Sequence, residues 1–272
     1  SLLAQIFHID TKYYLSILPT ATPYSRNAIF SGYYPNELQN EYGELWQKMW
    51  QDEHSMNRFE NQFLRDQLNR LGLESKSIHY HKVITYEEGN KLETRIGEFK
   101  EVDLLAIVIN FVDILGHSRS ESNILQEMVP DESAYRKAVC SWLENAWLLN
   151  VLEEISNWGH TVFLTSDHGS TRVTKPVQIK GDRQTSTGIR FKYGQNIKMP
   201  EKSGITIPNP EKYFLPKHDL NTNYLIAKSG NFLIYPNEYH KFANHYNNSF
   251  QHGGISLEEM VVPIAELKGK NG

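Results

Sequence analysis

The chain has 272 residues, with 28 basic and 32 acidic side chains, so its formal net charge is −4. This length fits one large α/β domain or two small ones, and a hydrophobic content of 39% excludes collagen-like and disordered classes. The single cysteine, Cys140, excludes an internal disulfide and a cysteine-based zinc finger. No apolar run reaches the roughly 18 residues that a membrane helix needs. Because Ser1 takes the place of an initiator methionine, we expect a piece of a longer protein.

The first part of the chain predicts two strands and two helices. Residues 13–18 are β-prone and end at a proline, and a short helix is expected over 24–31. A longer helix is expected from the cap Ser55 to the stop Gly72. Residues 104–110 form a continuous apolar run, which is typical of a strand covered on both faces.

The second part continues with a long helix and a further buried strand. The helix is expected to begin at Asp131 or Ser133 and to end at Gly159, and the strand to cover 161–166. A strand, a helix of this length and a strand predict a βαβ unit, and therefore a parallel sheet.

The last hundred residues change character. The segment 170–221 is polar and rich in glycine and proline, with little periodicity. A hairpin is expected from 223–229 and 231–235. Ser256 and Glu259 then form a capping box before a short helix, and 261–267 predicts a final strand.

Polar clusters follow the predicted strands, where chemistry in an open parallel sheet is expected. They contain Thr22, then Asp113 with His117, then Asp167 with His168. A further cluster places His252 before two glycines that let backbone pass close to a bound group. Each cluster alone also fits a helix cap or a turn. Together their carboxylate and imidazole groups favour zinc, manganese or iron over calcium.

Four strings make the chain recognisable: PTATPYSRNAIFSGYYP, the Asp-x-x-x-His at 113–117, FLTSDHG and FQHGGISLEEMVVPI. Together they resemble the PglZ domain family of the alkaline phosphatase superfamily, most of all the C-terminal effector domain of PorX-type response regulators. The resemblance covers essentially the whole chain. It implies one catalytic α/β domain over 1–272, an alkaline-phosphatase-like three-layer sandwich with a mostly parallel central sheet. It also implies a receiver domain upstream.

The resemblance implies two zinc ions, with Mn²⁺ as the alternative, and Thr22 as the nucleophile. The implied ligands are Asp113, His117 and His252 for one zinc, and Asp167, His168 and the Thr22 oxygen for the other. A threonine hydroxyl is too weak an acid to ionise at neutral pH, so a bound zinc ion must lower its pKa.

The family takes one more aspartate from a strand upstream of the nucleophile, and Asp10 lies too close to the strand 13–18 to supply it. We therefore expect the first strand to be missing from this chain.

A sulfatase, which needs a modified cysteine or serine, is disfavoured because Thr22 holds that position and Cys140 is expected on the core side of a helix.

Residues 171–202 carry eight basic and two acidic side chains, a net +6. This pattern fits a solvated loop, and it also fits a basic lid-like insertion over 170–222 that attracts a phosphorylated substrate. Arg190 and Lys192 are the substrate-binding candidates in this segment. Arg26 lies one helical turn beyond Thr22 and fits either phosphate binding or a structural salt bridge.

The function implied is a cytoplasmic phosphodiesterase or phosphatase acting on nucleotide-type phosphoesters, including linear or cyclic oligonucleotides. It would be the effector output of a two-component response regulator linked to protein secretion. The partners implied are the substrate, the receiver domain, a histidine kinase with other signalling proteins, and a second copy in a homodimer. Two alternatives remain open: a regulated dimerisation and interaction module with residual catalysis, and a phosphotransferase or mutase.

Overall fold

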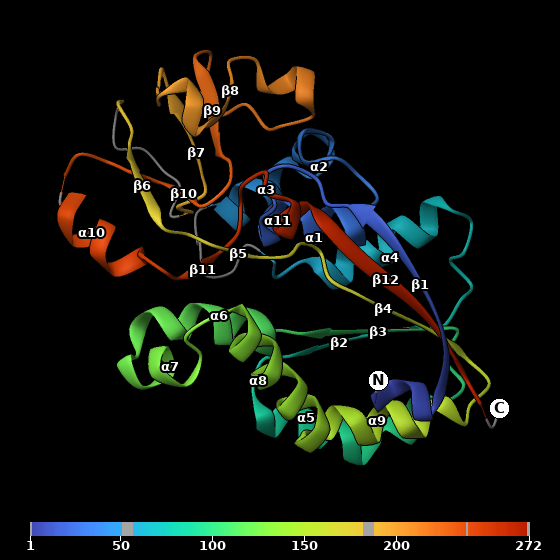
Figure 1. Ribbon diagram of the computed structural model, residues 1–272. Coiled ribbons are helices and arrows are strands. Elements are labelled where there is room, and N and C mark those ends of the chain that lie inside the picture. The colour runs from blue at the N-terminus through green and yellow to red at the C-terminus, as the bar shows by residue number, and fades with distance from the viewer. Residues whose placement is uncertain (1, 51–56, 182–187, 238, 271–272) are drawn as a thin grey trace. The chain divides into compact units, whose positions relative to one another are not determined.

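The computed structural model describes residues 2–50, 57–181, 188–237 and 239–270. The chain forms two compact units, each built from separate stretches of sequence. Unit 1 consists of Ser1–Tyr13, Leu73–Thr165 and Pro263–Gly272, and unit 2 of Tyr14–Gly72 and Ser166–Val262. Figure 1 labels the α-helices and strands of both units.

Unit 1 is a mixture of helices and strands. Its elements are η1 (Leu2–Gln5), β1 (Phe7–Leu15), β2 (Ile78–Val83), α5 (Tyr86–Arg95), η3 (Ile96–Phe99), β3 (Leu104–Ile109), α6 (Phe111–Glu121), α7 (Asn123–Met128), α8 (Glu132–Asn145), α9 (Trp147–Ser156), β4 (Thr161–Thr165) and β12 (Val261–Gly269). The unit boundary passes through β1 and β12, whose ends belong to unit 2.

The strands of unit 1 pair differently from the predicted βαβ unit. β3 pairs in parallel with β2, whereas β4 pairs antiparallel with β12 in the order β1-β12-β4. β2 has the sequence IHYHKV, whose polar residues make it unlike the apolar runs that are typical of buried strands. The expected strands at 104–110 and 161–166 are confirmed, but the described pairings do not make them neighbours.

The core of unit 1 lies between β2, β3, α5 and α9. Val83, Leu92, Trp147 and Val151 are at most 3% exposed, and they form one cluster. The predicted single helix over this region is wrong, because α8 ends at Asn145 and α9 begins at Trp147. A Cβ at Gly89 of α5 would lie 1.9 Å from the Trp147 indole, so the two helices are in close contact there. The break places that ring against α5.

Unit 2 contains the remaining elements. They are α1 (Thr22–Ser31), α2 (Pro35–Glu41), α3 (Gly43–Trp50), α4 (Glu60–Arg70), β5 (Thr171–Arg172), β6 (Lys175–Gln178), β7 (Phe191–Gln195), η4 (Glu201–Ser203), β8 (Gly204–Ile207), η5 (Pro210–Tyr213), β9 (Thr222–Ala227), β10 (Asn231–Ile234), α10 (Tyr239–Tyr246), β11 (Phe250–Gln251) and α11 (Leu257–Met260). The helix expected over 24–31 is confirmed by α1. Ser55, the expected cap of the helix that becomes α4, lies outside the described residues.

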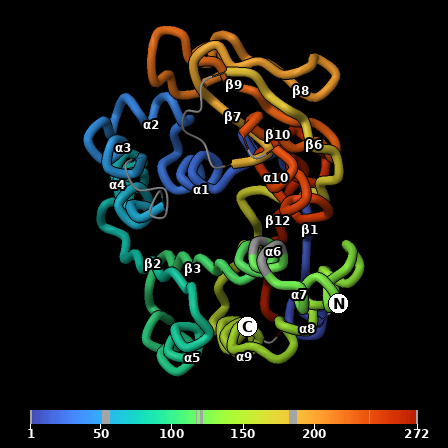
Figure 2. Tube along the Cα trace, turned by 90° about the vertical axis from the view of Figure 1, so that its left-hand side faces the viewer, coloured from blue at the N-terminus to red at the C-terminus, as the bar shows by residue number. Residues whose placement is uncertain are grey.

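The segment expected to be an irregular lid is largely structured. β7 and β8 flank β9 in an antiparallel sheet, which Figures 1 and 2 both show. The predicted hairpin of β9 and β10 is wrong, because β10 instead pairs in parallel with β6. The polar sequence of the segment did not predict these strands. Their pairing depends on partners that lie far along the chain.

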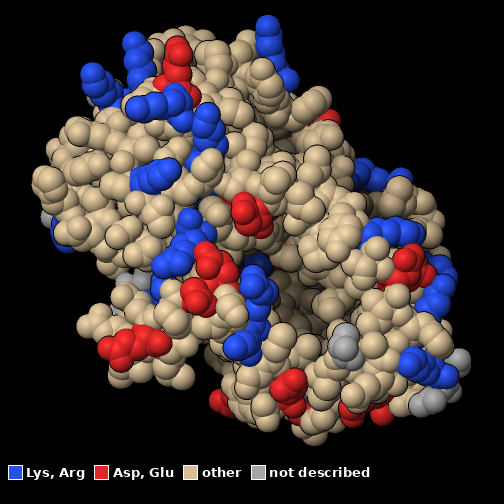
Figure 3. Space-filling view, in the orientation of Figure 1, with Lys and Arg blue, Asp and Glu red and all other residues tan. Residues whose placement is uncertain are grey.

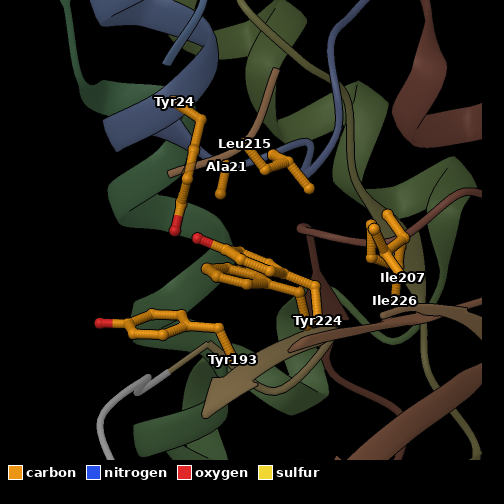
Figure 4. Close-up of a cluster of buried hydrophobic side chains, with 8 residues drawn as sticks. Ala21, Tyr24, Tyr193, Ile207, Leu215, Tyr224 and Ile226 are labelled. Atoms are coloured by element: carbon orange, nitrogen blue, oxygen red, sulfur yellow. The ribbon is translucent and has the colours of Figure 1, made fainter. Parts of the chain in front are cut away.

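An aromatic core joins this sheet to the first helix of unit 2. Tyr24 of α1, Tyr193 of β7 and Tyr224 of β9 are at most 5% exposed, and Figure 4 shows their rings in one cluster. The Trp50 ring contacts both Tyr24 and Tyr193 edge to face, at centroid distances of 5.6 Å. Helix α1 is therefore anchored to the sheet directly behind its first residue, Thr22.

The mixed α/β class agrees with the prediction. The described ladders are both parallel, as in β2/β3, and antiparallel, as in β12/β4. The three-layer sandwich with a mostly parallel sheet, the single domain and the missing first strand stay predictions. Figure 3 shows Lys and Arg interspersed with Asp and Glu on the visible face. Within the described ranges, no helix combines the length and apolar character needed to cross a membrane.

Candidate functional site

Thr22 is the first residue of α1, where the chain leaves the turn that follows β1. The buried Ala21 precedes it in an extended conformation, and Pro23 favours the helix start because its fixed φ suits the first turn. Thr22 is half-buried, and its Oγ1 lies 3.0 Å from Nε2 of His168. The helix start therefore presents the hydroxyl to an imidazole that lies 146 residues away in sequence.

His168 is held so that Nε2 faces Thr22. Its Nδ1 lies 2.9 Å from the carbonyl oxygen of Gly169. A carbonyl can only accept a hydrogen bond, so Nδ1 carries the ring hydrogen and Nε2 offers a lone pair. The side chain is 8% exposed. This arrangement suits Nε2 to accept the Thr22 hydroxyl hydrogen or to bind a metal.

Asp167 completes the immediate surroundings of Thr22. Its Oδ2 lies 3.5 Å from His168 Nε2 and accepts a hydrogen bond of 3.0 Å from Ser25 Oγ. Its main-chain oxygen accepts one of 2.7 Å from Ser16 Oγ. A Cβ at Gly169 would lie 2.0 Å from the Glu258 carbonyl oxygen, so only glycine fits at that position.

His252 lies beside His168 in the same unit. The two rings are stacked, with centroids 4.2 Å apart and an interplanar angle of 22°. His252 Nδ1 lies 3.2 Å from the Thr20 carbonyl oxygen. The structure thus brings together Thr22, Asp167, His168 and His252, four of the residues that the sequence singles out.

Asp113 and His117 lie on α6 in unit 1. Asp113 is exposed in the first turn of the helix, whereas the side chain of His117 lies outside the described residues. Burial raises the pKa of Tyr135 to about 12, and the nearby Asp113 carboxylate adds to this effect. The role of Asp113 and His117 as ligands of a second metal stays a prediction.

Arg26 forms a structural ion pair. Its Nε donates to Oε1 of Glu60 on α4, and the Glu60 side chain is completely buried. This agrees with the salt-bridge alternative for Arg26. Its predicted contact with a phosphate remains untested.

The interpretation of Arg190 as a substrate-binding residue is contradicted by its surroundings. Arg190 is 0% exposed, and all five of its N–H groups donate within the protein. Their acceptors are both carboxylate oxygens of Glu259, the Ser256 hydroxyl and the carbonyls of Ser229 and Asn231. A charge that looks solvated in the sequence is therefore part of the core.

Lys192 is also enclosed, at 5% exposure, and its ammonium lies over the Tyr235 ring, 5.2 Å from the ring centroid. The burial of Arg190 and Lys192 removes part of the positive surface expected of a basic lid. Cys140, expected on the core side of its helix, is exposed on α8.

The two glycines after His252 serve packing within the protein. A Cβ at Gly253, where φ is +111°, would lie 2.6 Å from the Phe191 ring. A Cβ at Gly254 would lie 2.4 Å from Nη2 of Arg190. The close neighbours of these glycines are Arg190 and Phe191, at the start of β7, whereas the sequence suggested a bound group.

Two separations among the donor atoms around Thr22 are close to those that a zinc ion requires of its ligands. Zinc bonds of 2.0–2.2 Å in a tetrahedron place the ligand atoms about 3.3 Å or slightly more apart. Thr22 Oγ1, His168 Nε2 and Asp167 Oδ2 have neighbouring separations of 3.0 and 3.5 Å. No set of three or more His, Cys, Asp or Glu in the described part of the chain could hold a metal. Thr22 would therefore have to supply the third donor.

Sequence reasoning missed the residues that position these groups. Ser16 and Ser25 bind Asp167, and Thr20 binds the loop that carries His252. Thr20 and Ser25 belong to the string PTATPYS, but a serine or threonine near a helix start first predicts a helix cap. Only the three-dimensional contacts reveal what they bind.

Comparison with known proteins gives one family. The model of the BREX system PglZ alkaline phosphatase-like domain matches residues 2–267. Among solved structures, phosphonoacetate hydrolase from Sinorhizobium meliloti 1021, in complex with phosphonoformate, matches with a TM-score of 0.40 and 11% sequence identity. The match covers 67% of this chain and half of the hydrolase (50%). No curated protein matches the chain.

Proposed function

Because the chain belongs to the PglZ alkaline phosphatase-like family, we propose that it is a zinc-dependent phosphodiesterase or phosphatase with Thr22 as its nucleophile. Family membership supports phosphoester hydrolysis as the class of reaction. The observation that carries the assignment of Thr22 is the distance of 3.0 Å between its Oγ1 and His168 Nε2, beside the Asp167 carboxylate.

The residues of unit 2 have separate tasks in this reaction. Asp167 and His168 would hold a zinc ion against Thr22 Oγ1, and Ser25 would hold the Asp167 carboxylate in place. When bound, zinc lowers the pKa of a hydroxyl and stabilises negative charge at phosphorus. Thr22 Oγ1 forms a bond to phosphorus, while the bond from phosphorus to the leaving oxygen breaks. Thr22 gives up its hydroxyl proton to solvent water, and solvent water delivers one proton to the leaving oxygen. A water oxygen then bonds to phosphorus as the bond from phosphorus to Thr22 Oγ1 breaks, and a proton of that water restores the Thr22 hydroxyl.

The finer parts of the proposal rest on the resemblance in sequence. They are a second zinc bound by Asp113, His117 and His252, Mn²⁺ as the alternative metal, and nucleotide-type substrates such as linear or cyclic oligonucleotides. They also include an upstream receiver domain, a histidine kinase and other signalling partners, a homodimer, a cytoplasmic location and a link to protein secretion. The arrangement of Thr22, His168 and His252 indicates no preference among these substrates.

Zinc binding tests this function directly. We expect the purified chain to bind zinc, and chelation to abolish its hydrolysis of a nitrophenyl phosphodiester, with recovery when zinc is added back. His168→Ala should weaken zinc binding by about 10-fold or more. Loss of a residue that merely orients a metal ligand already lowers the metal affinity by that factor, and His168 would be a ligand itself. Titration calorimetry measures the affinity, and His240→Ala, at an exposed histidine of the same unit, is the matched control.

Other results would support the alternatives. No zinc binding, together with no hydrolysis, would contradict the enzyme and favour a regulated interaction module. Zinc-dependent transfer of phosphoryl groups to an alcohol in preference to water would identify a phosphotransferase, because the two activities share the metal site and differ in the acceptor.

A further inference from the structure

Thr20 connects the turn that carries Thr22 to the loop that carries His252. Its side chain is 0% exposed. Thr20 Oγ1 accepts a hydrogen bond of 3.0 Å from the Gly253 amide and donates one of 2.8 Å to the Gly254 carbonyl. Its own carbonyl oxygen accepts from His252 Nδ1 at 3.2 Å. One residue therefore binds three consecutive residues of the loop.

The loop also packs closely against Arg190 and Phe191, at the start of β7. Phe191 would clash with a Cβ at Gly253, and the Arg190 guanidinium would clash with one at Gly254. Both glycines are buried, so their backbone groups need a partner within the protein. The Thr20 hydroxyl, with one donor and its acceptor lone pairs, serves the Gly253 amide and the Gly254 carbonyl.

These contacts determine the state of His252. Donation from Nδ1 to the Thr20 carbonyl leaves Nε2 as the nitrogen with a lone pair. His168 has the same state, because its Nδ1 donates to the Gly169 carbonyl. The two stacked imidazoles thus both have Nδ1 bound to a backbone carbonyl and the ring lone pair on Nε2.

We propose that Thr20 is a positioning residue, which holds His252 in its Nδ1–H tautomer and in register with Thr22. This inference rests on the proposed function, since His252 would then act on the same phosphoester as Thr22. Thr20 and Thr22 lie on one short segment, so any shift of the loop relative to Thr20 also shifts His252 relative to the nucleophile. Thr20 contributes through His252 and does not touch the substrate.

The test compares Thr20→Val, which removes the hydroxyl at nearly constant volume, with Thr20→Ser, which keeps it. The ¹⁵N shifts of the His252 ring are measured in the metal-free protein at a pH where the ring is neutral. We expect the Nδ1–H tautomer in the wild type and in Thr20→Ser, and a mixture of tautomers in Thr20→Val. With zinc, kcat of Thr20→Val should fall by about 10-fold to 100-fold, as for other partners that orient metal-binding groups.

The outcomes separate this inference from the proposed function. An Nε2–H tautomer in the wild type would overturn the role of Thr20, even if Thr20→Val fails to fold. An unchanged tautomer and unchanged kcat in a folded Thr20→Val would also overturn it. If the tautomer responds as expected but the wild type hydrolyses no phosphoester, the positioning role stands and the proposed function fails.

Discussion

Thr22→Val is expected to lower kcat/KM for a nitrophenyl phosphodiester by at least about 10³-fold at saturating zinc, since the loss of a nucleophile costs at least this much. Valine keeps the volume of threonine and removes only the oxygen that lies 3.0 Å from His168 Nε2. The variant should keep the melting temperature of the wild type, because Thr22 is half-buried and α1 is anchored by Tyr24. Steady-state kinetics and calorimetry measure the two effects.

Two further variants make the Thr22 result specific. Thr22→Ser keeps a hydroxyl and should retain a substantial part of the activity. Thr206→Val makes the same chemical change at an exposed position of β8 and should leave kcat/KM unchanged. Activity of Thr22→Val within a few-fold of the wild type would show that another group attacks phosphorus.

The largest effect on stability is expected at the buried ion pair of Arg190 and Glu259. Both side chains are 0% exposed, and their closest contact joins Arg190 Nη2 to Glu259 Oε2 at 2.6 Å. Glu259 also accepts hydrogen bonds from the amides of Gly254 and Ser256. Arg190→Met would leave an unpaired buried carboxylate, so the free energy of unfolding should fall by about 3–5 kcal/mol.

Denaturant titration measures this loss, and an exposed ion pair of the same unit provides the control. Lys217 lies 3.3 Å from Glu211, with 31% and 60% of their side chains exposed. Lys217→Met should leave the unfolding midpoint almost unchanged, because exposed pairs contribute little. Equal effects of the two substitutions would contradict the role of Arg190 in the core.

This ion pair also connects the core to the site. The Glu259 carbonyl accepts from the Gly169 amide, next to His168, and its carboxylate accepts from the Gly254 amide, near His252. We therefore expect substitutions at Arg190 to disturb both imidazoles. The basic character that suggested substrate binding serves instead to hold the two loops.

The sequence predicted which residues of unit 2 lie close together better than it predicted how the strands pair. Thr22, Asp167, His168 and His252 each follow a strand or a recognisable motif, and the structure brings them together. Local patterns also predicted the capping box at Ser256. These features depend on residues that are close in sequence.

Features that depend on distant partners were not predictable. Arg190 pairs with Glu259, 69 residues away, and a local charge count cannot distinguish such a pair from a solvated loop. β2 has alternating polar residues and is recognised only through its partner β3. The same limit applies to Thr20, whose contacts lie more than 230 residues along the chain.

Chemical trapping tests the central claim, that Thr22 attacks phosphorus, most directly. The zinc-loaded chain is mixed with a phosphoester, quenched in acid during turnover and digested, and the peptides are sequenced by mass spectrometry. We predict one added phosphoryl group on Thr22, absent from Thr22→Val and from the protein treated with chelator. Turnover with no phosphorylated threonine, or with the phosphoryl group on another residue, would contradict the account.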